Sequence, residues 1–255
     1  MRCFLEQILP HHSTAFAVLG VKDGREVMRC KGCGLIMCST ADREQYLQLY
    51  KETTRYFELV GAGYTDFEDR FQHDYVVSEA RFGNLMQHAG GATTLLDVGT
   101  GNGALLRRGL KLGFICYGVD LNEWMLSKAR ELVPAAKLYH GELTELSFDM
   151  TFDVITFIDV FEHLLNVMTY VARIDELLSP GGLLVLETPD TASDGWRNQR
   201  LEWAHCKPLE HPFLYNEKHI RAIFGTIGLA IVDKVFTIPG RCTYYLRRRH
   251  KRIQR

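Results

Sequence analysis

Glycine occupies alternate positions directly after an apolar run in the stretch TTLLDVGTGNGALLRRGL, which begins at Thr93. The apolar run ends in Asp97, and the glycines are Gly99, Gly101 and Gly103. A glycine-rich turn between a strand and a helix brings backbone N–H groups and the N-terminus of the helix close to a ligand, usually an anionic one. We therefore expect a small-molecule site at this turn.

The glycine spacing and the acid separate two classes of ligand. Dinucleotide sites use the spacing G-x-G-x-x-G and bind a diphosphate at the helix N-terminus, whereas this chain has G-x-G-x-G. A carboxylate at Asp97 would repel a diphosphate, but it would suit a ligand with a cationic ammonium group. S-Adenosylmethionine carries both an ammonium and a carboxylate, so it fits this turn better than NAD does.

The segment LLDVGTGNG resembles motif I of class I S-adenosylmethionine-dependent methyltransferases, and later passages resemble further motifs of that family in order. YGVDLNEWML resembles the second-strand motif, whose acidic residue, here Asp120, binds the ribose hydroxyls. Glu142 and Leu143 match positions near the adenine, with Glu142 standing where many relatives have Asp, and LLSPGGLLVLETPD resembles the fifth-strand signature. The resemblance covers about residues 90 to 250. The cofactor-binding residues that it implies are Asp97, Gly99, Thr100, Gly101, Gly103, Asp120, Leu121, Glu142, Leu143, Ile158, Asp159 and Val160.

Strand and helix patterns alternate from Thr94 onward, which is typical of a parallel sheet covered on both faces. Near the end of the chain, the short connection TIPGR separates two expected strands. It is too short for a parallel crossover, so these strands should pair antiparallel. The family's reversed seventh strand agrees with this. We expect an α/β fold with a doubly wound, mostly parallel seven-stranded sheet and an antiparallel last strand.

The chain divides into three expected zones. Residues 1–40 form a small zinc-ribbon-like module, residues 41–90 a helical cap or linker, and residues 91–255 the S-adenosylmethionine-binding domain.

Four of the seven cysteines lie in the first zone. The odd number and uneven placement favour a reducing, cytoplasmic setting over a disulfide framework. Cys30 and Cys33 have the C-x-x-C spacing of a zinc knuckle, and Cys3 is a candidate third ligand. Some methyltransferases of this group carry an N-terminal ribbon with two such pairs, and this chain resembles the second pair and half of the first. We expect structural zinc at Cys3, Cys30, Cys33 and His11. Glu6, His12 and Cys38 are alternative fourth ligands, and the other possibility is a metal-free ribbon held by apolar packing.

Two histidines are candidates for the base that removes a proton from the methyl acceptor. Methyl transfer to a hydroxyl requires alignment of the nucleophile and removal of its proton. His163, in VFEHL, follows the fourth strand, and His211, in PLEHPFLY, lies in a segment that resembles the family's substrate-facing region. We expect one of them to be the catalytic base. An unperturbed imidazole has a pKa of about 6.5, so the rate should rise with pH through that region.

Composition and missing motifs indicate which class of methyl acceptor to expect. Thirty basic residues nearly balance 31 acidic ones, so nucleic acid is not expected as a partner. Two signatures of nucleic-acid methyltransferases are missing: the Asn/Asp-Pro-Pro-aromatic motif and the Pro-Cys nucleophile. We therefore expect a small-molecule acceptor, such as a sugar, glycolipid precursor or secondary metabolite, with oxygen as the target atom. No apolar run reaches the roughly 20 residues of a membrane span, and the first twenty residues make a poor signal peptide. The alternatives are an inactive methyltransferase-like binding module and an NAD-dependent oxidoreductase or epimerase.

Overall fold

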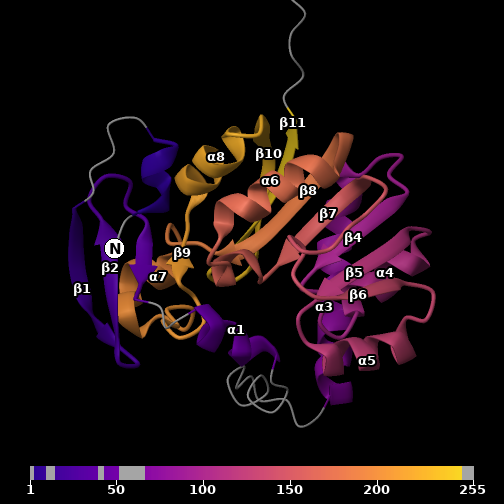
Figure 1. Ribbon diagram of the computed structural model, residues 1–255, viewed down its shortest axis with the longest axis horizontal. Coiled ribbons are helices and arrows are strands. Elements are labelled where there is room, and N and C mark those ends of the chain that lie inside the picture. Colours follow the sequence, from indigo (N-terminus) through magenta and orange to yellow (C-terminus); the bar gives the residue numbers. More distant parts are fainter. Residues whose placement is uncertain (1–2, 10–14, 40–42, 52–66, 249–255) are drawn as a thin grey trace, which may run out of the picture. The chain divides into compact units, whose positions relative to one another are not determined.

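The computed structural model describes residues 3–9, 15–39, 43–51 and 67–248 (Figure 1). The chain forms two compact units, and each is built from more than one segment of the sequence. The first unit comprises Met1–Ala41, Asp159–Asp175 and Leu186–Arg255, and the second comprises Asp42–Ile158 and Glu176–Val185. These units do not follow the three consecutive zones expected from the sequence.

The main sheet has seven strands in the order β10-β11-β8-β7-β4-β5-β6. Their bounds are β4 Thr94–Val98, β5 Ile115–Asp120, β6 Lys137–His140, β7 Phe152–Ile158, β8 Leu178–Pro189, β10 Leu229–Ile238 and β11 Arg241–Arg248. β4 pairs in parallel with both β5 and β7, and β5 pairs in parallel with β6. β10 and β11 pair antiparallel, as the short connection between them predicts. The expected mixed sheet with an antiparallel last strand is therefore confirmed.

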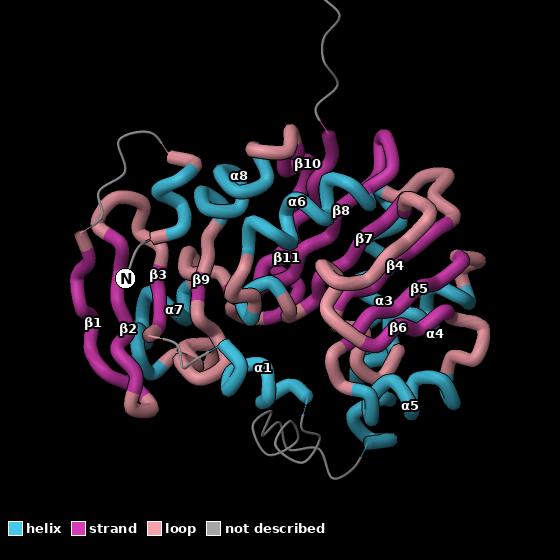
Figure 2. Tube along the Cα trace, viewed as in Figure 1, coloured by secondary structure: helices cyan, strands magenta, loops and turns pink. Residues whose placement is uncertain are grey.

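Within the second unit, Figure 2 shows β7, β4, β5 and β6 side by side, in the order that their hydrogen bonds give. β4 is buried after its first residue, which explains its uninterrupted apolar run. The sequence does not predict β6, because it is a short strand at the edge of the sheet. Its side chains are half-buried or exposed, so it carries no apolar run.

The described helices of the second unit include those that precede and follow the glycine turn. They are α1 Arg43–Lys51, α3 Phe67–His88, α4 Ala104–Lys111 and α5 Glu123–Leu132. Asn122 caps α5, because its Oδ1 accepts a hydrogen bond of 3.0 Å from the backbone N–H of Met125. The helices of the first unit are α6 Val167–Leu177, α7 Asp194–Gln199 and α8 Glu217–Gly225, with the 3₁₀ turns η1 Phe4–Gln7, η2 Phe161–His163 and η3 Arg200–Glu202.

A second sheet joins the N-terminal residues to a distant segment. Its order is β1-β2-β3-β9, with bounds β1 Phe16–Lys22, β2 Arg25–Cys30, β3 Ile36–Cys38 and β9 Phe213–Leu214. All neighbouring strands pair antiparallel. A buried cluster covers this sheet with residues from both segments: Val27, Ile36, Cys38, Trp196, Trp203, Cys206 and Leu214. The N-terminal residues therefore share their core with the segment after β8. A two-residue strand such as β9 shows no periodicity in the sequence.

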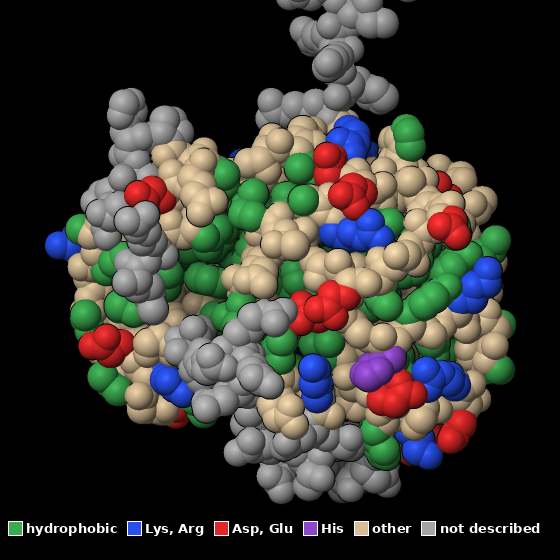
Figure 3. Space-filling view, in the orientation of Figure 1, with side chains coloured by type: hydrophobic (Ala, Val, Ile, Leu, Met, Phe, Trp, Pro, Cys, Tyr) green, Lys and Arg blue, Asp and Glu red, His purple; other side chains and the backbone are tan. Residues whose placement is uncertain are grey.

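Acidic and basic side chains are interspersed on the face drawn in Figure 3. In the part of the chain that the structure describes, no helix is long and apolar enough to cross a membrane.

Candidate active site

The glycine turn between β4 and α4 adopts the backbone conformation that glycine favours. Gly99, Gly101 and Gly103 have φ values of 72°, 53° and 79°. A Cβ atom at Gly103 would approach Cγ2 of Val133 to 2.9 Å and Cβ of Ala129 to 3.2 Å. The third glycine is therefore required both by its dihedral angle and by the close approach of α5.

Asp120, the last residue of β5, holds this turn through its carboxylate. Its Oδ2 accepts a hydrogen bond of 2.7 Å from the N–H of Gly101, and its Oδ1 accepts one of 2.8 Å from the N–H of Asn122. Burial raises the pKa of Asp120, and the N–H groups of Asn122 and Gly101 act in the opposite direction. Each carboxylate oxygen can accept more than one hydrogen bond, so Asp120 can also accept from a diol in a ligand.

Asp97 lies near the end of β4 and is almost fully buried. Its Oδ1 accepts a hydrogen bond of 2.6 Å from Oγ1 of Thr156 on β7. Burial raises the pKa of Asp97 to about 6, although the bond from Thr156 opposes this shift. A buried carboxylate of this kind is stabilised by a nearby cation, which fits the ammonium group expected from the sequence.

Two asparagines that the sequence reading did not select connect the turns to the preceding helices. Asn102 accepts from the N–H of Ala104 at 3.1 Å and donates from Nδ2 to Oδ2 of Asp74, on α3, at 2.9 Å. Asn122 donates from Nδ2 to the carbonyl oxygen of Tyr50, on α1, at 3.1 Å. The helices before residue 90 thus support the candidate cofactor turns.

The remaining candidate cofactor residues of the second unit follow the same strand ends. Leu121 comes directly after β5, Glu142 and Leu143 follow β6, and Ile158 ends β7. Because β4, β5, β6 and β7 run parallel, these positions gather at one edge of the sheet. Thr100 is buried, and its side chain interacts with Asp97, where it opposes the rise that burial causes in the pKa of that carboxyl. The carboxylates of Asp97 and Asp120 at this edge can accept from an ammonium and a diol, so the residues fit S-adenosylmethionine. Asp159 and Val160 belong to the first unit.

The two candidate catalytic histidines lie together in the first unit, beside Glu162. The nitrogen or oxygen ligand atoms of Glu162, His163 and His211 all lie within 4.8 Å of one another. The two imidazole rings meet edge to face, with 4.7 Å between their centroids. The structure therefore brings together two residues that are far apart in the sequence.

Backbone carbonyls orient both imidazoles. Nδ1 of His163 is 2.8 Å from the carbonyl oxygen of Glu210, and Nδ1 of His211 is 2.7 Å from that of His205. A carbonyl oxygen only accepts, so Nδ1 is assigned the hydrogen in each ring. A neutral His211 then has its lone pair on Nε2, where it can accept a proton.

The ionisation of this cluster differs from the sequence expectation. Burial lowers the pKa of His163 to about 4 and that of His211 well below its usual value. The expected pKa of about 6.5 is therefore wrong, because the sequence did not show that these rings are removed from water. Burial, together with the neighbouring charge of Asp159, raises the pKa of Glu162 to about 8.

Charged and polar neighbours fix the position of Glu162 and Asp159. Oγ1 of Thr188 donates to Oε2 of Glu162 at 2.9 Å, and Arg241 pairs with Asp159 at 3.0 Å. Asp159 has a φ of 54°, which is uncommon for a residue other than glycine. The sequence reading missed Glu162, Thr188 and Arg241 as site residues, since Thr188 and Arg241 come from β8 and β11.

Residues 91–234, more than half of the chain, match a family model described as a methyltransferase domain. The chain belongs to this methyltransferase family. The match confirms the resemblance drawn from the glycine turn and the motifs that follow it.

Curated relatives of this chain act on different atoms, according to their names. The chain is 32% identical over 114 residues to the dTDP-3-amino-3,4,6-trideoxy-alpha-D-glucopyranose N,N-dimethyltransferase of Streptomyces venezuelae, covering 41% of this chain and 47% of that protein. It is 27% identical over 157 residues to the ubiquinone biosynthesis O-methyltransferase of Pasteurella multocida, covering 55% and 65%. The matches thus span about half to two thirds of these relatives.

Solved structures share the fold of this chain. The 1,6-didemethyltoxoflavin-N1-methyltransferase of Burkholderia thailandensis, with its substrate and S-adenosylhomocysteine bound, has a TM-score of 0.63 at 16% identity, covering 91% of this chain and 99% of that chain. The magnesium protoporphyrin IX methyltransferase of Synechocystis PCC 6803, with bound S-adenosylhomocysteine, has a TM-score of 0.61 at 18% identity, covering 82% and 100%.

Three of the four expected metal ligands lie together. Cys3, Cys30 and Cys33 form a buried group, whereas His11 lies outside the described residues. Cys38, one alternative ligand, instead packs in the apolar cluster that includes Cys206. Among the described residues, Glu6 does not join the cysteine group, and His12, like His11, is not described.

Proposed function

We propose that this chain transfers a methyl group from S-adenosylmethionine to a hydroxyl group of a small molecule. The observation that carries the proposal is the glycine turn tied to Asp120 through the N–H of Gly101. When bound, S-adenosylmethionine supplies a methyl group that is already activated on a sulfonium. The chain must therefore bind the cofactor, align the acceptor and remove one proton.

The cofactor roles follow from the positions of the residues at the sheet edge. Asp120 accepts hydrogen bonds from the ribose hydroxyls, and Asp97 faces the ammonium group. The methionine carboxylate lies beside the glycine turn. The N–H groups of Gly99, Thr100, Gly101 and Gly103 donate within the chain and do not bind it. Glu142 and Leu143 bind the adenine end. The other residues proposed to line the cofactor are Thr100, Leu121, Ile158, Asp159 and Val160.

His211 takes the proton from the acceptor hydroxyl in this proposal. Its Nδ1–H is held by the carbonyl of His205, which leaves Nε2 as the proton-accepting atom. His163 packs against it and shares the site, and Glu162 lies within reach of both rings. The depressed pKa keeps His211 neutral at physiological pH, so its lone pair is free, but it also makes the imidazole a weaker base.

A hydroxyl acceptor is favoured because a hydroxyl, unlike a neutral amine, is a poor nucleophile until a base removes its proton. Two neutral imidazoles suit that task. The relatives include an O-methyltransferase and an amino-sugar N,N-dimethyltransferase by name, so both oxygen and nitrogen acceptors belong in a screen. The near-balance of charge favours a small acceptor over nucleic acid. A cytoplasmic location is proposed because the seven cysteines are odd in number and unevenly placed.

The test is turnover with methyl-labelled S-adenosylmethionine on a panel of sugars, phenols and amino sugars. We expect label transfer to a hydroxyl acceptor. On that acceptor, His211→Ala should lower turnover by roughly 10²–10⁴-fold and leave cofactor affinity unchanged. The parent's rate should vary little above about pH 5, because the pKa of His163 lies near 4 and that of His211 is also low.

His205→Ala is the matched control. It removes a histidine side chain from the same segment but keeps the carbonyl group that orients His211, so it should retain turnover. If both His163→Ala and His211→Ala keep near-parental turnover, neither histidine is the base. Transfer to amines alone would refute the hydroxyl acceptor and leave methyl transfer standing.

A further inference from the structure

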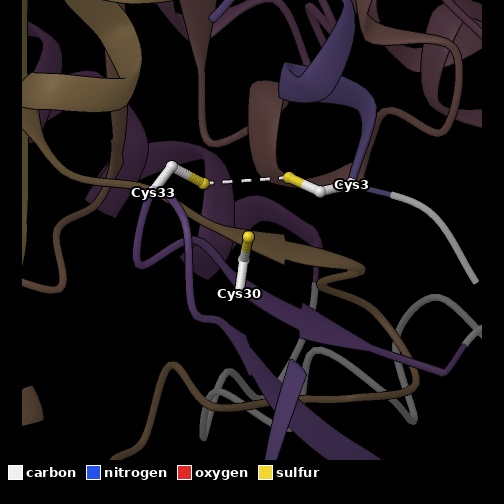
Figure 4. Close-up of side chains that lie close together, drawn as sticks. All are labelled: Cys3, Cys30 and Cys33. Carbon is white, nitrogen blue, oxygen red and sulfur yellow. Dashed lines mark hydrogen bonds between the residues drawn. The ribbon is translucent and has the colours of Figure 1, made fainter. Parts of the chain in front are cut away.

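Three buried thiols from two separate segments converge in the first unit. Cys3 comes just before η1, Cys30 ends β2, and Cys33 lies in the turn between β2 and β3. Their exposed fractions are 1%, 0% and 6%. Figure 4 shows the three sulfur atoms directed toward a common centre, and all three lie within 4.8 Å of one another.

The sulfur spacing separates a metal site from a disulfide. Sγ of Cys3 lies 3.7 Å from Sγ of Cys33. A disulfide would hold two sulfurs about 2.05 Å apart. Zinc bonded to thiolate sulfurs at about 2.3 Å in a tetrahedral arrangement holds them about 3.8 Å apart. The observed separation excludes a disulfide and fits two thiolates bonded to one ion. It is also that of a direct thiol–thiol contact, so the inference rests on the convergence of all three sulfurs.

The backbone between Cys30 and Cys33 is already folded for this geometry. The N–H of Gly34 donates to the carbonyl oxygen of Cys30 at 2.9 Å, and the N–H of Cys30 donates to that of Leu35 at 2.9 Å. Gly34 has a φ of 85°, a conformation that favours glycine. The tight turn directs the two thiols of the C-x-x-C pair to the same side.

A histidine from a distant helix supports the turn. Nδ1 of His219, on α8, accepts from the N–H of Asn216 at 3.1 Å, so its hydrogen is on Nε2. Nε2 then donates to the carbonyl oxygen of Cys33 at 3.1 Å, across 186 residues of sequence. His219 is itself buried, with 1% of its surface exposed. It orients the residue that bears a thiol, as outer hydrogen-bond partners do at metal sites.

The geometry points to a single zinc ion bound by the thiolates of Cys3, Cys30 and Cys33, with His219 as the residue that positions Cys33. The ion links the start of the chain to the β2–β3 turn, and His219 links that turn to α8. The site is structural and lies outside the proposed methyl-transfer machinery. The sequence predicted the three cysteines, but it did not identify His219.

The first test is the zinc content of the full chain, purified without chelators. We expect one zinc per chain, released when a mercurial reagent modifies the thiols. Cobalt substitution should give the intense visible absorption of a tetrahedral thiolate site. Cys38→Ala is the matched control, since Cys38 is also buried in this unit but packs in the apolar cluster, and this variant should keep its zinc.

Cys33→Ser should lose the metal, and the parent measurements decide the question if that variant fails to fold. His219→Ala should bind zinc roughly 10–100-fold more weakly in a competition with a chelator, whereas His219→Gln, which keeps a donor, should bind it nearly as tightly as the parent. A parent chain with no zinc and three freely titrating thiols overturns the inference, as does equal zinc affinity in His219→Ala. Cofactor binding measured on the same sample keeps this result separate from the methyltransferase proposal.

Discussion

At the scale of single residues, Asp120 is the side chain on which the proposed cofactor site depends most. It accepts from two backbone N–H groups, of Gly101 and Asn122, and is proposed to accept from the ribose as well. Asp120→Ala removes charge-assisted hydrogen bonds, which contribute about 1.5–3 kcal/mol each. We expect S-adenosylmethionine affinity to fall by roughly 10–150-fold in calorimetric titration.

A matched control for this variant lies at the opposite end of the sheet. Asp153 also accepts from two backbone N–H groups, those of Thr93 and Thr94, but at the start of β4. Asp153→Asn should therefore affect stability and leave cofactor affinity unchanged. If Asp120→Ala binds S-adenosylmethionine as tightly as Asp153→Asn does, then Asp120 does not bind the ribose.

The sequence could predict residues whose role depends on neighbouring positions in the chain. It could not predict residues whose role depends on contacts with distant segments. Gly99, Gly101 and Gly103 were predictable because the turn requires their conformation at fixed spacing. Glu162 and Arg241 were not, because their roles depend on neighbours from other strands. The protonation of His163 and His211 could not be predicted either, since burial, which sets it, is a property of the folded chain.

At the scale of elements, the contact between β5 and the glycine turn leaves no spare volume. A Cβ atom at Gly118 would lie 2.8 Å from Leu106 and Leu138 and 2.9 Å from Cγ2 of Thr100. Gly118→Ala should cost about 1–3 kcal/mol through overpacking, which lowers Tm by about 2–12 °C. Cofactor affinity should also fall, because Thr100 must move.

Gly83→Ala provides the comparison for this element. Gly83 lies in α3, and a Cβ atom there would meet no atom within 4 Å. Alanine favours helix over glycine by about 0.8–1.0 kcal/mol, so thermal denaturation should show a higher Tm. A Gly118→Ala protein as stable as Gly83→Ala would show that the packing around the turn is not tight.

Elements with a periodic apolar pattern were predictable from the sequence, and those without one were not. β4, β5 and β7 carry buried apolar runs, and the short link before β11 predicted its antiparallel pairing. β6 lies at the sheet edge with exposed side chains, and β9 has only two residues. Pairing of β9 with β3 is a tertiary contact between distant segments, which no local pattern contains.

At the scale of the whole molecule, buried ionisable groups make stability depend on pH. The carboxyl of Glu162, whose pKa is raised to about 8, keeps its proton in the folded chain while the unfolded chain loses it above about pH 4.5. Folding stability therefore falls as pH rises between these values, by at most about 1.4 kcal/mol per pH unit. It should level off above about pH 8.

Glu162→Gln replaces the neutral acid with a neutral amide and removes this dependence. Relative to the parent, the variant should gain stability from pH 5.5 to pH 8 in urea denaturation. Glu145 is exposed, so the stability of Glu145→Gln should change with pH in the same way as that of the parent. If the parent and Glu162→Gln lose stability equally over this range, the Glu162 carboxyl is not protonated in the folded chain.

The division into two units was the least predictable feature of the whole molecule. The first unit combines the N-terminal residues with segments after Ile158, and the second takes in Glu176–Val185 from beyond the first unit's middle segment, so no reading in consecutive zones describes them. The mostly parallel sheet follows from the alternating strand and helix patterns, but the junctions after Ile158 and Val185 are set by which segments pack together.

The most direct test of the central claim is calorimetric titration of the purified chain with S-adenosylmethionine and, separately, with NAD. The glycine turn with Asp97 and Asp120 predicts one S-adenosylmethionine bound per chain and no heat with NAD. Binding of NAD without binding of S-adenosylmethionine would contradict the account.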